Sequence, residues 1–220
     1  MQVTQTHRPL PAATRLLVAA ALGIALGLFS TAGDAIHVRV VNGLANSTAP
    51  WIAVAFAAGA IQVARPAAVA AGVIALLFAV ATYYVGFVLS GYGFLLPFWI
   101  AWSAAAVGAG AVFGTAGQTW RHGSDRWRLL AVALLSGWLV AESAFRLIGI
   151  QFWTGVSLES TYVQVALADA LGATAAVFLL IDRRHWLVVA RAALLIAVVA
   201  LLLFLASERL LRWVGGLGGS

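Results

Sequence analysis

Two ionisable residues, Glu142 and Arg146, lie four positions apart in an otherwise apolar stretch, residues 129–150. Residues at positions i and i+4 share one face of an α-helix, so this carboxylate and this guanidinium can pair. The next apolar stretch, residues 162–181, contains Asp169. A charge at the centre of a bilayer costs about 2.5 to 3.5 kcal/mol on insertion scales, which makes ionisable groups inside a membrane candidates for function. We therefore expect Glu142, Arg146 and Asp169 to form a buried polar centre.

Two interpretations of this polar centre are open. In our leading hypothesis the protein binds or transports a small polar or aromatic molecule, with Glu142 and Asp169 holding charge or protons and Arg146 pairing an anionic group. In the alternative, the three side chains form a salt-bridge cluster that fixes the packing of two helices and needs no ligand, as in a structural or assembly protein. No feature of the sequence separates the two interpretations.

Four aromatic residues, Tyr83, Tyr84, Trp99 and Trp102, fall in the same predicted half of the membrane as the polar centre. Tyrosine and tryptophan are enriched at membrane interfaces, so an interfacial belt is the simpler explanation of their position. The hypothesis of a binding site predicts instead that these rings stack a ligand in an outward-facing basin.

Other chemistries find little support in the composition. The chain has no cysteine, which excludes disulfides and thiolate metal sites. Its four histidines fall in loops or at span ends, so we predict no haem, metal site or other cofactor. Ser143 adjoins Glu142, but neighbours on a helix point about 100° apart, which makes them a poor nucleophile and base and argues against an enzyme. The net charge of +6 is spread over loops, which suits lipid headgroups rather than nucleic acid.

The elements that must position the polar centre are membrane-spanning helices. Hydrophobic residues make up 63% of the 220 residues and charged residues 9%, about a third of the charged fraction of an ordinary soluble domain. This predicts one all-α, polytopic transmembrane helix bundle over residues 1–220. We expect about seven spans, at residues 15–33, 50–64, 67–89, 94–118, 129–150, 162–181 and 186–206. Six spans is the alternative, because the second apolar segment is short.

The distribution of arginine predicts the orientation of these spans in the cell membrane, the inner membrane of a bacterium. With seven spans and a cytoplasmic N-terminus, the C-terminus lies outside, and most of the arginines fall near the cytoplasmic face, as the positive-inside rule requires. These arginines are Arg8, Arg15, Arg65, Arg121, Arg126, Arg128, Arg183, Arg184 and Arg191.

Two local patterns refine the expected bundle. Gly23 and Gly27 form a small-xxx-small face on the first span, which lets another helix pack closely. Residues 34–50 form a polar outer connection that could hold a short extended or re-entrant piece. In it, Asn46 and Ser47, followed by Pro50, predict the start of a helix. The bilayer is the predicted partner, and partner membrane subunits or a second copy of the chain are left open.

A set of apolar motifs resembles those of a family of small multi-pass proteins of unknown function from actinobacteria. The motifs are Asn46-Ser47-x-x-Pro50-Trp51-x-x-x-Ala55-Phe56-x-x-Gly59, Tyr83-Tyr84, and Phe113-Gly114-x-Ala116-Gly117 with Arg121. This resemblance covers most of the chain and implies no activity. The first helix, with Ala21-x-x-x-Ala25, is more faintly similar to the substrate-binding S components of energy-coupling-factor vitamin transporters. That similarity implies an outward-facing pocket, although S components have six spans.

Overall fold

The fold is almost entirely helical, as the sequence predicts. A computed structural model describes residues 10–36, 38–91, 93–94, 96–149 and 160–217, and no β-strand occurs within these ranges. The α-helices are α1 (Ala12–Ala35), α2 (Arg39–Ala45), α3 (Thr48–Ala60), α4 (Arg65–Leu89), α5 (Leu96–His122), α6 (Asp125–Ala144), α8 (Ser160–Leu180) and α9 (Trp186–Leu217). A π-helical turn, η1 (Phe145–Gly149), continues α6, and a 3-10 turn, η2 (Arg183–His185), precedes α9.

Six helical segments within the described ranges are long and apolar enough to cross a membrane, which makes the chain a multi-pass membrane protein. They are Ala12–Ala35, Arg65–Leu89, Leu96–His122, Asp125–Ile148, Thr161–Leu180 and Arg183–Ala206. The expected second span is the short helix α3, whose 13 residues extend roughly 20 Å, against a hydrocarbon core of about 30 Å. The long helices thus match the alternative of six spans.

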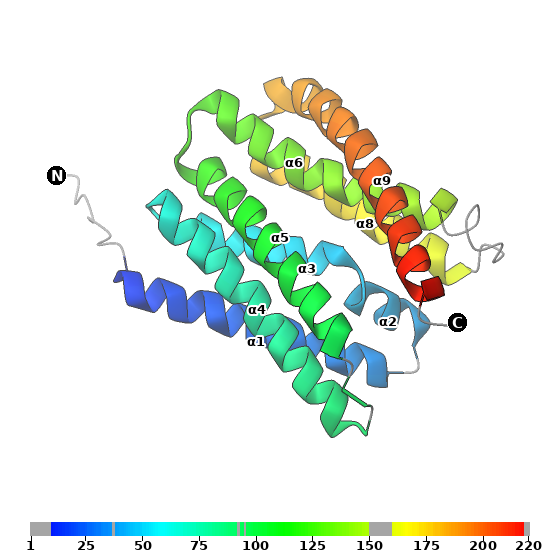
Figure 1. The fold of residues 1–220 in the computed structure, drawn as a ribbon. Helices are drawn as coiled ribbons and strands as arrows, with labels where there is room; N and C mark the ends of the chain where they lie inside the picture. The colour runs from blue at the N-terminus through cyan, green and yellow to red at the C-terminus, as the bar shows by residue number, and fades with distance from the viewer. Residues whose placement is uncertain (1–9, 37, 92, 95, 150–159, 218–220) are drawn as a thin grey trace.

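The short α3 nevertheless returns the chain across the bundle. Figure 1 shows α3 running back beside α4, so that α1 and α4 begin at the same end of the bundle. Helix α2 and the break after it occupy the rest of this return path. In place of the extended piece considered from the sequence, residues 39–45 form the helix α2. The described N-terminal and C-terminal ends consequently lie at opposite ends of the bundle (Figure 1).

The helices form two groups. The first contains α1, α3, α4 and α5, with α4 packed against the other three. In the second group, α6 packs against both α8 and α9. The groups meet where α5 and α3 contact α6 and where α2 contacts α8 (Figure 1). We call this boundary the seam.

Glycines let the helices of the first group approach one another closely. A Cβ atom built on Gly59 of α3 would lie 1.9 Å from the carbonyl oxygen of Gly114 in α5. A Cβ on Gly23 of α1 would lie 2.0 Å from the carbonyl oxygen of Ala75 in α4, and one on Gly27 would lie 2.6 Å from that of Ala79. The predicted small-residue face of the first helix is therefore confirmed as a packing face.

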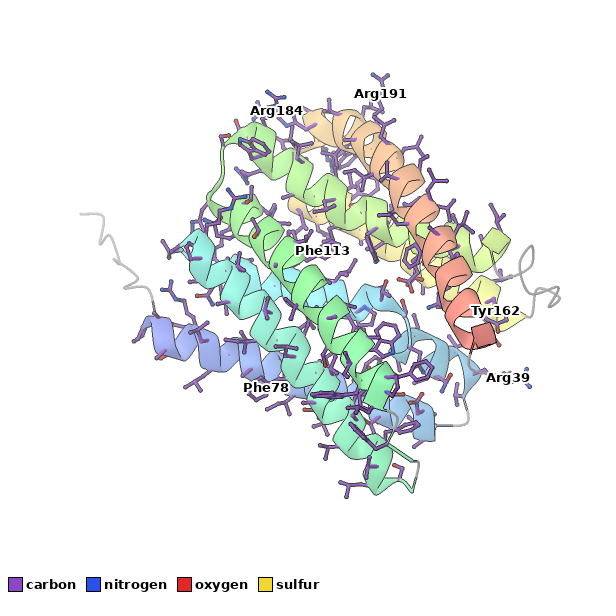
Figure 2. All side chains as sticks on the ribbon, viewed as in Figure 1. Arg39, Phe78, Phe113, Tyr162, Arg184 and Arg191 are labelled. Carbon is purple, nitrogen blue, oxygen red and sulfur yellow. The ribbon has the colours of Figure 1, made fainter. Side chains whose placement is uncertain are left out.

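Charged residues mark the two ends of the bundle. Figure 2 shows Arg184 and Arg191 near the start of α9, and Arg39 at the opposite end near Tyr162. Large apolar side chains lie both inside and outside the middle of the bundle: Phe113 is 2% exposed in the interior, whereas Phe78 is 46% exposed on the outer face of α4. This pattern fits a protein with lipid around its middle.

Candidate functional site

The predicted pair of Glu142 and Arg146 is present at the end of α6. Arg146 Nη2 donates a hydrogen bond to Glu142 Oε1 at 2.9 Å, which is also an ion pair. The Glu142 side chain is 4% exposed and that of Arg146 is 15% exposed. Arg146 lies in the π-helical turn η1, a type of helix irregularity that often marks a functional site.

Asp169 of α8 completes the predicted cluster. Its side chain is 1% exposed, and its Oδ2 atom lies 3.5 Å from Arg146 Nε. The guanidinium thus contacts both acids. The distance qualifies as an ion pair, but neither Arg146 Nε nor Asp169 Oδ2 makes a hydrogen bond to any described group. The carboxyl group of Asp169 is therefore less completely hydrogen-bonded than that of Glu142.

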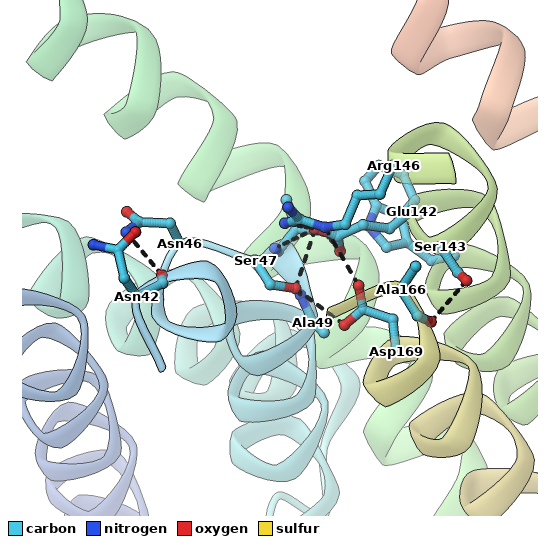
Figure 3. A network of polar contacts seen from close by, with 11 residues as sticks. Asn42, Asn46, Ser47, Ala49, Glu142, Ser143, Arg146, Ala166 and Asp169 are labelled. Carbon is cyan, nitrogen blue, oxygen red and sulfur yellow. Dashed lines mark hydrogen bonds and ion pairs between the residues drawn. The ribbon is translucent and has the colours of Figure 1, made fainter. Parts of the chain in front are cut away.

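Two residues that the sequence did not assign to the site, Ser47 and Thr48, join it from the start of α3. Figure 3 shows Ser47 between Glu142 and Asp169. Thr48 N donates to Glu142 Oε1 at 2.8 Å, and the Thr48 hydroxyl donates to Glu142 Oε2. Ser47 Oγ lies 3.1 Å from Glu142 Oε1 and 3.2 Å from Asp169 Oδ1. Ser47 was expected to start a helix, but nothing in its local sequence identifies an acid 95 residues away as its partner.

Ser47 is the N-cap of α3. Its Oγ accepts a hydrogen bond from Ala49 N at 3.1 Å, and the residue is 1% exposed. The first amides of a helix have no partner within the helix, and the aligned peptide dipoles place a partial positive charge there. Ser47 and Glu142 together satisfy the amides of Ala49 and Thr48. The start of α3 is thus an anion site that the chain fills with its own carboxylate.

Trp138 connects this site to the apolar core. Its Nε1 donates to Thr48 Oγ1 at 2.8 Å, so the threonine hydroxyl accepts from the indole and donates to Glu142. The indole ring packs edge-on against Phe113 of α5, with centroids 5.7 Å apart. It also contacts Phe204 of α9 in a tilted arrangement, with centroids 5.1 Å apart. The polar cluster and the packing of three helices are therefore linked through one side chain.

A second polar cluster lies at the end of the bundle where α1 leads into α2. Asp34 Oδ1 accepts from Asn42 Nδ2 at 3.1 Å and from Asn46 Nδ2 at 2.7 Å, and Asp34 Oδ2 accepts from the Tyr83 hydroxyl at 2.8 Å. A pocket of about 110 Å³ adjoins this cluster. Its lining is Thr31, Asp34, Ala35, Tyr83, Phe87 and Ser90.

The other aromatic residues of the predicted site are distributed differently. Tyr84 is 8% exposed and packs edge-on against Phe94, whose ring lies 6.2 Å from that of Trp99. Trp99 is 37% exposed and Trp102 is 54% exposed, so both lie at the outer surface of α5. The structure therefore brings Glu142, Arg146 and Asp169 together, places Tyr83 beside Asp34, and leaves Trp99 and Trp102 facing the surroundings.

The remaining side chains at the site restrict its chemistry. Ser143 donates its hydroxyl to the carbonyl oxygen of Ala166 at 2.8 Å, which ties α6 to α8 and directs the hydroxyl away from Glu142. Among the described residues, no group of three or more histidine, cysteine, aspartate or glutamate side chains is placed to hold a metal ion. What the cluster can do is hold an anion and exchange protons between two carboxyl groups.

Comparison with known proteins places the chain in a family without assigning a role. No curated protein and no solved structure matches it. The sequence model of a family of unknown function matches residues 6–212, which is nearly the whole chain. This match agrees with the resemblance to an uncharacterised family and carries no information on S components, so that similarity stays a prediction. The chain belongs to the family of unknown function DUF6518.

Proposed function

We propose that this protein is a membrane-embedded binding or transport protein for a small molecule that carries an anionic group. The observation that carries the proposal is the anion site at the start of α3, where Thr48 and Arg146 hold the carboxylate of Glu142. In many secondary transporters, interrupted helices end near the middle of the membrane and direct their N-termini at anionic groups of the substrate.

The hydrogen-bond donors around Glu142 support the proposal that a ligand carboxylate binds here. Thr48 N, Thr48 Oγ1 and Arg146 Nη2 all donate to the Glu142 carboxylate. These three donors suit any carboxylate, and charge-assisted hydrogen bonds of this kind are the strong ones. A ligand carboxylate takes the same donors when the Glu142 side chain rotates away, so Glu142 acts as an internal competitor of the ligand.

The position of the cluster supports a transport role. Ser47 and Thr48 belong to the first helix group, whereas Glu142, Arg146 and Asp169 belong to the second. Their hydrogen bonds cross the seam, so replacing Glu142 with a ligand changes the contacts between the groups. Rocking of one helix group against another around a fixed site is a common mechanism of alternating access.

We place the end of the bundle that holds Asp34 and Tyr83 outside the cell. Most of the arginines in the described residues lie at the other end, near the starts of α4, α6 and α9 and the end of α5. By the positive-inside rule that end is cytoplasmic, with the N-terminus inside and the C-terminus outside. In this orientation the pocket beside Asp34 is the outer entrance, and the protein resides in the cell membrane.

A structural role is the second candidate, and a specific contact favours it. Arg146 contacts both acids, at 2.9 Å and 3.5 Å, and the cluster already satisfies the start of α3. Such a network fixes α3, α6 and α8 to one another without any ligand. The two candidates differ in one measurable respect, which is whether the seam opens.

Substituted-cysteine labelling tests this opening, because the chain has no natural cysteine. Ala49→Cys places a thiol in the first turn of α3, beside the anion site. We expect a small anionic methanethiosulfonate to label it in the folded, reconstituted protein. Acetate, succinate or glutamate should slow labelling by competing for the anion site, and the additional change Glu142→Gln should accelerate it by weakening the seam.

The matched control is Ala58→Cys on the same helix, since Ala58 is 0% exposed and lies far from the site. This thiol should stay unreactive until the protein unfolds. If Ala49→Cys is as unreactive as Ala58→Cys, with and without Glu142→Gln, the transport proposal is wrong and the structural role stands. If Ala49→Cys is labelled but none of the three carboxylates slows the reaction, the proposal that the ligand is anionic is wrong.

A further inference from the structure

We propose that Asp169 carries a proton in this state of the protein, and that Asp169, Ser47 and Glu142 form a proton relay. This inference concerns protonation and does not depend on the identity, or the existence, of a transported ligand. It stands on the hydrogen-bond geometry of the cluster shown in Figure 3.

The Ser47 hydroxyl has one proton and two lone pairs. Its oxygen accepts from Ala49 N and lies within hydrogen-bond distance of Glu142 Oε1 and Asp169 Oδ1. If both acids were ionised, Ser47 could donate to one of them, and the second contact would set two oxygens together with no proton between them. A proton on Asp169 Oδ1 removes this conflict, because Asp169 then donates to Ser47 and Ser47 donates to Glu142.

The partners of the two acids decide which one carries the proton. Glu142 accepts hydrogen bonds from Thr48 N, Thr48 Oγ1 and Arg146 Nη2, all of which favour its ionised form. Asp169 is 2% exposed, and its Oδ2 makes no hydrogen bond to the described residues. An ionised Asp169 would therefore be shielded from water and would have no hydrogen-bond donor on Oδ2, where Arg146 Nε lies 3.5 Å away.

Charge balance leads to the same assignment. Of the described elements packed against α8, α6 presents Glu142 and η1 presents Arg146 toward Asp169. The charged residue of α2, Arg39, is exposed. The one charged residue of α9 whose side chain is described, Arg191, lies at the opposite end of the bundle (Figure 2). An ionised Glu142, a protonated Asp169 and a cationic Arg146 make a neutral cluster, whereas two ionised acids leave a net charge in a medium where a charge is expensive.

The relay moves one proton in two coupled steps. Asp169 Oδ1 gives its proton to Ser47 Oγ, while the original Ser47 proton passes to Glu142 Oε1. The negative charge thereby shifts from Glu142 to Asp169, whose Oδ2 already lies 3.5 Å from Arg146 Nε. Arg146 then has Asp169 as its anionic partner, and the neutral Glu142 is held less firmly at the start of α3. In the proposed transport role, this step would vacate the anion site.

Infrared difference spectroscopy tests the protonation directly. We expect the purified wild-type protein at neutral pH to show the carbonyl stretch of a protonated carboxyl group, shifted in heavy water. Heavy carbon in the side-chain carboxyl of aspartate should shift this band, and the same label in glutamate should not. Wild-type protein without such a band, or with one that follows the glutamate label, would overturn the proposal without any variant.

Variants then assign the band to one aspartate and test the relay. Asp169→Asn should abolish the band, and Asp34→Asn should retain it, because Asp34 is saturated with donors in the outer cluster. Ser47→Ala should retain the band at a shifted frequency, since the proton loses its acceptor, and Ser47→Thr should restore the frequency. A band that survives Asp169→Asn in folded protein, or one that Ser47→Ala leaves unshifted, would contradict the proposed arrangement.

Discussion

Thr48 N donates a hydrogen bond to Glu142 Oε1 at 2.8 Å, so the first turn of α3 is closed by a carboxylate that lies 94 residues later in the chain. Helix α3 begins inside the bundle, where water is scarce, and its free amides need a partner from elsewhere in the protein. Glu142 supplies that partner, and Arg146 neutralises it. One carboxylate thereby stabilises the start of an interrupted helix and joins the two helix groups.

The first prediction concerns the removal of this carboxylate. Glu142→Ala strands Arg146 and the amide of Thr48, so it should lower the free energy of unfolding by about 3 to 5 kcal/mol. Glu142→Gln should cost less, because its amide oxygen still accepts from Thr48 N. Equilibrium unfolding in mixed detergent micelles measures the free energy of unfolding of both variants. A loss of stability is thus expected whether or not Glu142 also takes part in ligand binding, because the carboxylate holds Thr48 N and Arg146.

The control for this prediction is Asp182→Asn at the end of α8. Asp182 pairs with Arg184 at 3.2 Å, but both side chains are more than half exposed, so the change should be close to neutral. Equal losses for Glu142→Ala and Asp182→Asn would show that the buried cluster contributes no more than a surface ion pair.

The second prediction concerns the hydroxyl of Thr48, which bridges Trp138 and Glu142. Thr48→Val removes this bridge with little change in shape, and Trp138→Phe removes the donor but keeps an aromatic ring against Phe113. Trp138→Phe should lower the free energy of unfolding by about 0.5 to 1.5 kcal/mol, the usual net value of one neutral hydrogen bond. Thr48→Val should lower it further, because it also removes the bond to the charged Glu142, and bonds to charged groups contribute about 1.5 to 3 kcal/mol. Because the two changes break the same bond, the double variant should cost less than the sum. Strict additivity in a double-mutant cycle would show that the bond contributes nothing.

Much of the architecture was predictable because its signals are local. Apolar runs located the six long helices, the spacing of Glu142 and Arg146 predicted their pairing, and Gly23 and Gly27 marked a packing face. Ser47 and Thr48 could not be assigned to the site in the same way. Their role depends on where an unusually short helix begins relative to α6, and that position is set by long-range packing rather than by local sequence.

The orientation of the aromatic residues was also beyond the sequence, for a different physical reason. In a soluble protein, polar residues show which face of a helix is exposed. In a membrane bundle, lipid and core are both apolar, so the sequence does not show which face of its helix Trp102 occupies. The structure places it at the surface, 54% exposed. Whether it or any of the other aromatic residues contacts a ligand stays a prediction.

The third prediction concerns the contact between α3 and α5. Gly59→Ala places a methyl group where the carbonyl oxygen of Gly114 now lies 1.9 Å away, so the two helices must separate. Overpacking of this kind costs about 1 to 3 kcal/mol. The matched control is Gly108→Ala on α5, because a Cβ there meets nothing within 4 Å. A loss for Gly59→Ala no larger than for Gly108→Ala would contradict the close approach of α3 and α5.

The fourth prediction concerns the outer polar cluster. Tyr83→Phe removes the hydroxyl that donates to Asp34 Oδ2 at 2.8 Å, and hydrogen bonds to charged groups contribute about 1.5 to 3 kcal/mol. Because Asp34 is only partly buried, Tyr83→Phe should lower the free energy of unfolding by an amount near the lower end of this range. Tyr84→Phe is the control on the same helix, since its hydroxyl makes no hydrogen bond to the described residues and should be dispensable. Unfolding measurements that rank the two changes in the opposite order would show that the Tyr83 bond is unimportant.

The fifth prediction concerns orientation, and the absence of cysteine makes it simple to test. Gly93→Cys places a thiol in the exposed connection between α4 and α5, whereas Ser124→Cys places one between α5 and α6, beside the gathered arginines. The positive-inside rule predicts that Gly93→Cys lies outside the cell. A thiol reagent that does not cross membranes should therefore label it in spheroplasts with an intact cell membrane. Ser124→Cys should react only after permeabilisation. The reverse labelling pattern would show that the bundle has the opposite orientation in the membrane. The pocket beside Asp34 and Tyr83 would then open to the cytoplasm, and an anionic ligand would enter from within the cell.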